Sequence, residues 1–112
     1  MTVQLIGFRD NKNGGTILTP WSLVHFLSGA AAKQTGLFPR AYMWFIAHGL
    51  YEVKDQILDS TTEHVRSVIN SVGDQASAML GYFAVKSKVS MTYFYVWIGS
   101  IAVALMLEIE PR

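Results

Sequence analysis

The stretch from Trp44 to Tyr82 places polar side chains inside apolar segments, at His48-Gly-Leu-Tyr-Glu52 and at Asn70-Ser-Val-Gly-Asp74. The outer members of each quoted segment are four positions apart, so on a helix they lie on one face, one turn apart. Apolar segments rarely carry such groups unless the groups meet, because a polar group buried alone loses its hydrogen bonds to water. We therefore expect both pairs to meet inside a small bundle of helices.

The composition favours a membrane protein of one domain. The chain has 112 residues, of which 51% are hydrophobic and 15% charged, against about 25% charged in ordinary soluble domains. A net charge of +1 with no basic stripe excludes a nucleic-acid partner. The absence of cysteine excludes disulfides and thiolate metal sites.

Four hydrophobic segments predict an all-α fold, a compact bundle of about four membrane helices with the first two short. The segments are residues 20–32, 41–53, 70–85 and 89–107. Thr19 is the expected N-cap of the first helix, with Pro20 at its first position. The bundle thus covers residues 20–112, and residues 1–19 form an N-terminal arm or a small hairpin around an Asn/Gly-rich turn.

Two shorter patterns refine the helices. Ser60-Thr-Thr-Glu63 has the form of a capping box, which predicts a helix beginning near Thr61, either continuous with the next segment or broken near Asn70. Gly73, Ser77 and Gly81 recur every four residues, a stripe that lets another helix of the same chain approach closely.

The expected location is an integral membrane position, in a cell membrane or in the internal membrane of a virion. Residues 89–107 carry no charge, and Tyr93, Tyr95 and Trp97 lie near one end of this segment, as in an interfacial belt. The lipid bilayer is therefore the first expected partner. The two short connections contain bases and no acids, which weakly favours a cytoplasmic side for Lys33, Arg40, Lys86 and Lys88.

Five polar residues should gather near one membrane face. His25 lies early in the first segment, His48 and Glu52 late in the second, and Asn70 and Asp74 early in the third. An up-down-up path brings all five to the same depth. We expect Glu52 to lie near His48, and Asp74 near His25 or Asn70, because a buried acid needs a partner.

Residues 20–88 resemble a known family. Trp21-Ser-x-x-His25-Phe-x-x-Gly29, then Gly49-x-Tyr-Glu52, then Ile69-Asn-Ser-x-x-Asp74 followed by Gly81, are similar to the pattern of small membrane proteins grouped with the VanZ-like families. The resemblance implies a membrane helical bundle with a polar site near one surface and a link to cell-envelope processes such as glycopeptide resistance. This chain departs from the pattern by its short first and second segments.

Three functions remain open. In an enzyme acting on lipid or envelope precursors, Glu52 or Asp74 would be the general base, a histidine the acid, and Asn70 would orient the substrate. A metal variant would use His25, His48, Glu52 and Asp74, but the Glu-x-x-His pairs of carboxylate-bridged bundles are missing, so neither a metal nor a cofactor is assigned.

The other two functions need no catalysis. The five residues would hold the helices in register through hydrogen bonds. Alternatively, the chain is a membrane-embedded assembly protein that contacts neighbouring membrane or capsid proteins, such as a minor capsid protein of a virus with an internal membrane.

Overall fold

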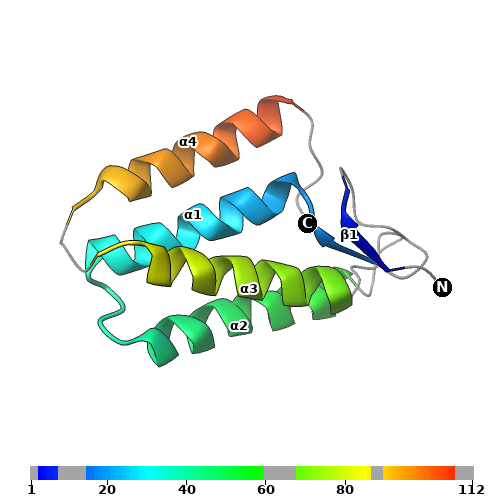
Figure 1. The fold of residues 1–112 in the computed structure, drawn as a ribbon, viewed down its shortest axis with the longest axis horizontal. Helices are drawn as coiled ribbons and strands as arrows, with labels where there is room; N and C mark the ends of the chain where they lie inside the picture. The colour runs from blue at the N-terminus through cyan, green and yellow to red at the C-terminus, as the bar shows by residue number, and fades with distance from the viewer. Residues whose placement is uncertain (1–2, 8–14, 60–67, 87–89, 108–112) are drawn as a thin grey trace.

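The computed structural model describes residues 3–7, 15–59, 68–86 and 90–107. Within these ranges the elements are β1 (Gln4–Ile6), β2 (Thr16–Leu18), α1 (Pro20–Thr35), α2 (Ala41–Asp59), α3 (Val68–Ala84) and α4 (Thr92–Met106). Successive helices run in opposite directions; α1 and α3 pack together at the centre, α4 covers α1 and α2 covers α3 (Figure 1). The predicted compact helical bundle is confirmed.

The helix boundaries differ in places from the apolar segments that predict them. α2 continues through residues 54–59, and α3 passes through Asn70 without a break. The predicted capping box at 60–63 lies outside the described residues. α4 has 15 residues, fewer than the uncharged segment 89–107. Across the described ranges, no helix combines the length and the apolar composition that crossing a membrane requires.

The start of α1 follows the predicted cap. Pro20 occupies the first helical position, and the Thr19 backbone N–H donates to Ser22 Oγ at 3.0 Å. Pro20 suits this position because the first helical residue has no intrahelical partner for an N–H. At the other end Gly36 adopts a left-handed conformation with φ 77° and its N–H donates to Lys33 O. These two ends fix the length of the helix that carries His25.

The N-terminal arm is not a hairpin. β1 and β2 pair in parallel, with Gln4 opposite Thr16 and Ile6 opposite Leu18, whereas a hairpin would pair them antiparallel. The direction of β2 is set by α1, which it enters directly, and by α3, where Asn70 Nδ2 donates to Thr16 O at 2.8 Å. The sequence gives no signal for this docking, so of the two predicted alternatives, an arm or a hairpin, the hairpin is wrong.

Small residues allow α1 and α3 to cross at close range. A Cβ at Gly29 would collide with the carbonyl of Ala78, and a Cβ at Gly81 with the carbonyl of Phe26. Both neighbours are backbone atoms, so neither can turn away. Of the predicted stripe, Gly81 packs against another helix as expected, whereas Gly73 lies against the backbone of Ile17 in β2.

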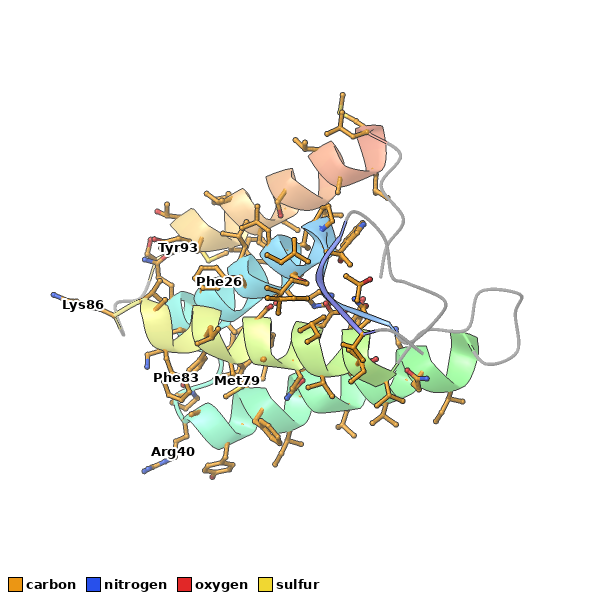
Figure 2. All side chains as sticks on the ribbon, turned by 45° about the vertical axis from the view of Figure 1, so that its right-hand side comes forward. Phe26, Arg40, Met79, Phe83, Lys86 and Tyr93 are labelled. Atoms are coloured by element: carbon orange, nitrogen blue, oxygen red, sulfur yellow. The ribbon has the colours of Figure 1, made fainter. Side chains whose placement is uncertain are left out.

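One end of the bundle carries exposed bases. Figure 2 shows Arg40 and Lys86 at the end where α1 and α3 finish and α2 and α4 begin, with Tyr93 beside them. Arg40 and Lys86 are both exposed. The polar residues singled out in the sequence lie away from this end, deeper between the helices.

Candidate functional site

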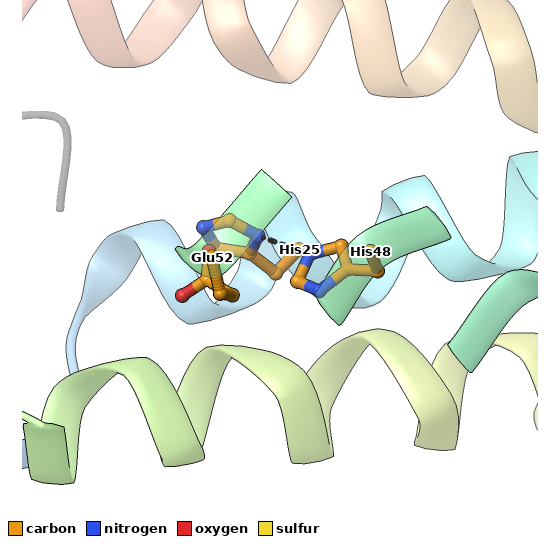
Figure 3. A group of neighbouring side chains, drawn as sticks. All are labelled: His25, His48 and Glu52. Atoms are coloured by element: carbon orange, nitrogen blue, oxygen red, sulfur yellow. Dashed lines mark hydrogen bonds between the residues drawn. The ribbon is translucent and has the colours of Figure 1, made fainter. Parts of the chain in front are cut away.

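Four of the five polar residues predicted to meet do so between α1, α2 and α3. His25 comes from α1, His48 and Glu52 from α2, and Asp74 from α3. Their exposed fractions are 7%, 4%, 6% and 0%, respectively. His48 and Glu52 lie one turn apart on the same face of α2, so both point toward α1 (Figure 3).

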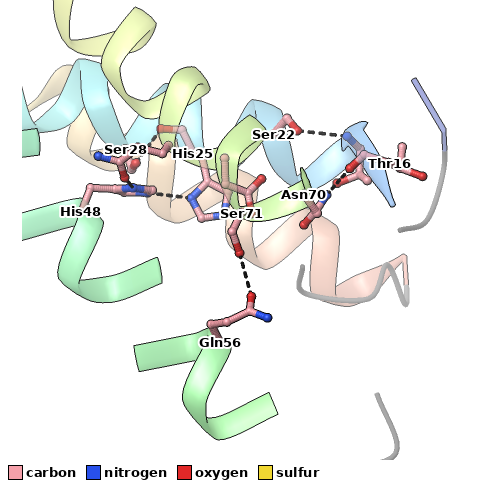
Figure 4. A network of polar contacts seen from close by, with 11 residues as sticks. Thr16, Ser22, His25, Ser28, His48, Gln56, Asn70 and Ser71 are labelled. Carbon is pink, nitrogen blue, oxygen red and sulfur yellow. Dashed lines mark hydrogen bonds and ion pairs between the residues drawn. The ribbon is translucent and has the colours of Figure 1, made fainter. Parts of the chain in front are cut away.

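The two histidines form the centre of a line of polar contacts. His25 Nδ1 lies 2.9 Å from His48 Nε2 (Figure 4). A residue of α3 lies on the outer side of each ring: Asp74 Oδ2 is 3.3 Å from His25 Nε2, and Gln75 Oε1 is 2.7 Å from His48 Nδ1. The sequence predicts Asp74 near His25 or Asn70, and the contact with His25 is present.

Gln75 is a site residue that sequence reasoning missed. Its Nε2 donates to the backbone carbonyl of Phe45 at 3.0 Å, so its amide joins α3 to α2 and holds the ring of His48. The available signal was a glutamine inside an apolar segment, next to Asp74. Because adjacent positions on a helix point in different directions, the face shared by Asn70 and Asp74 does not include it.

Asn70 lies one turn before Asp74 and serves a different contact. It is fully buried, and its Nδ2 donates to Thr16 O, which fastens β2 to α3. It is not among the residues that line the cavity beside the histidines. The geometry therefore connects Asn70 with the N-terminal strands.

An aromatic cavity of about 300 Å³ adjoins the histidines. His25 and His48 lie in its wall, and all three tryptophans of the sequence contribute to the lining, together with Tyr51. The cavity wall is formed by α1, α2 and α4. Such a cavity suits the apolar part of a ligand, and the two imidazoles are positioned to contact a polar group on it.

Glu52 completes a group of possible metal ligands. One ligand atom from each of His25, His48 and Glu52 lies within 4.8 Å of the others. Imidazole nitrogen and carboxylate oxygen are the donors that first-row transition metals accept in the absence of cysteine. The arrangement can therefore bind either a polar ligand group or a cation.

Comparisons with protein-family models, with curated proteins and with solved structures find no match to this chain.

Proposed function

We propose that this chain is an integral membrane bundle that acts on a lipid-like molecule held in the aromatic cavity. The distribution of residues supports membrane insertion, because large apolar side chains face outward and polar ones inward. Exposed apolar residues occur on every helix and include Leu23, Phe45, Leu50, Val72, Phe83 and Val103. Buried polar residues include Ser22, His25, His48, Glu52, Asp74 and Ser77.

This distribution is the reverse of what water favours. Soluble monomers rarely expose contiguous apolar patches larger than a few hundred Å². In a bilayer the same side chains contact lipid, and polar residues are stable only where they contact each other. The basic end with Arg40, Lys86 and Tyr93 suits a lipid headgroup region.

The observation that carries the proposal is the position of His25 and His48 in the wall of a cavity that is otherwise apolar and aromatic. A lipid-like molecule would place its hydrocarbon against the tryptophans and its polar group against the imidazoles. Asp74 and Gln75 do not line the cavity, so they act as positioning residues that fix the two rings.

The resemblance to the VanZ-like families suggests the class of substrate. It rests on the ordered His25, Glu52, Asn70 and Asp74 positions, and it favours lipids or lipid-linked precursors of the cell envelope. Three of these four residues belong to the buried cluster beside the cavity.

A second candidate is a non-catalytic membrane protein with an assembly role, including a minor capsid protein of a virus with an internal membrane. It is favoured by side chains that join helices directly. Trp44 Nε1 donates to Ala78 O at 3.1 Å, and Gln75 Nε2 donates to Phe45 O at 3.0 Å, and both bonds connect α2 with α3. In this case the cavity would have no ligand of its own.

Filling the cavity separates the two candidates. Ala47 lines the cavity, whereas Ala102 is exposed on α4, so Ala47→Phe and Ala102→Phe add the same volume inside and outside it. The probe is a phospholipid brominated on its acyl chain, which quenches tryptophan fluorescence on contact, added to the full chain in detergent. We expect strong quenching in the wild type and in Ala102→Phe, and a severalfold weaker effect in Ala47→Phe. Equal quenching in all three proteins would favour the assembly role.

A further inference from the structure

The orientation of the Gln75 amide determines which nitrogen of His48 carries hydrogen. Gln75 Nε2 donates to the carbonyl of Phe45, so Oε1 is the atom that faces His48 Nδ1 at 2.7 Å. An amide oxygen only accepts hydrogen bonds. His48 Nδ1 must therefore donate, and in the neutral ring Nε2 holds a lone pair.

The same reasoning applies to His25. The carboxylate of Asp74 lies 3.3 Å from His25 Nε2. A hydrogen on Nε2 is attracted to this carboxylate, whereas a lone pair there would be repelled by it. In the neutral ring this leaves the lone pair of His25 on Nδ1.

These two lone pairs point at each other. His25 Nδ1 and His48 Nε2 are 2.9 Å apart, and two lone pairs at that distance repel unless a proton or a metal cation lies between them. Glu52 is beside the two rings, and one ligand atom from each of His25, His48 and Glu52 lies within 4.8 Å of the others (Figure 3). We propose that His25 Nδ1, His48 Nε2 and a carboxylate oxygen of Glu52 form a binding site for a divalent transition-metal cation such as zinc.

The surroundings of the two histidines match those of known metal sites. A histidine that binds a metal almost always donates its other N–H to a carboxylate, a carbonyl or water, which fixes the ring and makes it a better ligand. Asp74 and Gln75 provide such partners for His25 and His48.

The types of donor atom indicate which metal the site would prefer. The mixed nitrogen and oxygen donors favour zinc or another first-row metal over magnesium or calcium, which prefer oxygen alone.

Three protein ligands leave one coordination position for another molecule. In a tetrahedral zinc site with Zn–N bonds of about 2.0–2.1 Å, two ligand nitrogens are about 3.3 Å apart. His25 Nδ1 and His48 Nε2 are 2.9 Å apart, so the two rings would move apart by a few tenths of an ångström when the metal binds. His25 and His48 both line the aromatic cavity, and the fourth position is expected to face it. Catalytic zinc sites have this composition, with three protein ligands and one exchangeable position.

Metal binding can be tested without a lipid substrate, so its failure is distinct from failure of the proposed function. The full chain is purified in detergent, stripped with EDTA and titrated with zinc chloride in a calorimeter. We expect a single tight site per chain. Cobalt chloride, titrated separately, should give the visible absorption bands of a four-coordinate site with nitrogen and oxygen ligands.

Variants distinguish this site from adventitious binding. Asp74→Asn changes only the partner behind His25 and should weaken zinc binding by about 10–100-fold. Glu52→Gln keeps the size of the side chain and His48→Gln removes an imidazole, and each should weaken binding by more than Asp74→Asn does. His64→Gln removes the remaining histidine of the sequence and should leave the affinity unchanged. Circular dichroism verifies that each variant is folded.

Two results would overturn the proposal. The first is a folded wild type that binds zinc no more tightly than Glu52→Gln does. The second is a cobalt spectrum that Glu52→Gln and Asp74→Asn leave unchanged. Either result would mean that the close contact of the two rings is a hydrogen bond with a proton between the nitrogens. Because two of the three site variants conserve side-chain shape, the test remains decisive if His48→Gln does not fold.

Discussion

Asn70 and Asp74 lie one turn apart on α3, yet they serve different parts of the molecule. Asp74 contacts His25 beside the cavity, whereas Asn70 donates to Thr16 O and fastens the N-terminal strand. Both side chains are fully buried. A spacing of four positions establishes that two residues share a helix face, but the partner of each depends on which element packs over that turn.

At the residue scale, Asn70→Ala should lower stability and leave the cavity site intact. The variant removes a buried hydrogen bond to Thr16 O, a loss of about 1–3 kcal/mol in the free energy of unfolding. Ser71→Ala is the matched control, since Ser71 Oγ donates to Gln56 Oε1 at a half-buried position, and its cost should stay within about 0.5 kcal/mol. Thermal unfolding in detergent measures both variants. Loss of zinc or lipid binding in folded Asn70→Ala would instead assign Asn70 to the site.

At the scale of elements, the crossing of α1 and α3 sets the distance between His25 and Asp74. A Cβ at Gly81 would meet the backbone of Phe26 and Ala30, so Gly81→Ala should push the helices apart and destabilise the bundle by about 1–3 kcal/mol. A Cβ at Gly99 on α4 would meet no atom within 4 Å, so Gly99→Ala should stabilise its helix by about 0.5–1 kcal/mol. We expect a lower melting temperature for Gly81→Ala and a higher one for Gly99→Ala. Equal shifts would contradict a tight crossing of α1 and α3.

At the scale of elements, part of the fold and of the site could be predicted from the sequence. Apolar segments, the cap at Thr19 and Pro20, and the four-residue spacing of His48 and Glu52 predict helices and a polar cluster because these patterns are local to one helix. The parallel pairing of β1 and β2 was not predictable, since it depends on the docking of β2 on α3. The role of Gln75 and the meeting of three tryptophans around one cavity depend on how each helix is rotated about its axis.

At the scale of the whole molecule, polar residues occupy the interior and apolar residues the outside. The line of contacts from Asp74 through both histidines to Gln75 joins the three helices α1, α2 and α3. Outside this cluster, Trp21, Val24 and Ala104 are buried where α4 packs on α1, and the Tyr93 backbone N–H donates to Gln34 Oε1 at 3.1 Å. A bilayer would stabilise this arrangement, because lipid accepts the apolar exterior and gives the interior polar groups no competing water.

A charge placed on the apolar exterior tests this view directly. Leu50 is 65% exposed at the middle of α2, and Leu37 is 76% exposed in the connection before it, near the basic end. If α2 contacts lipid, Leu50→Arg should cost about 2.5–3.5 kcal/mol and sharply reduce the amount of protein retained in membranes after an alkaline wash. Leu37→Arg should be tolerated, because an arginine near the headgroups reaches water. If the exterior faced water instead, replacing an exposed leucine should change the free energy of unfolding by no more than about 0.5 kcal/mol. Equal membrane retention and equal stability of Leu50→Arg and Leu37→Arg would therefore argue that the exterior does not contact lipid.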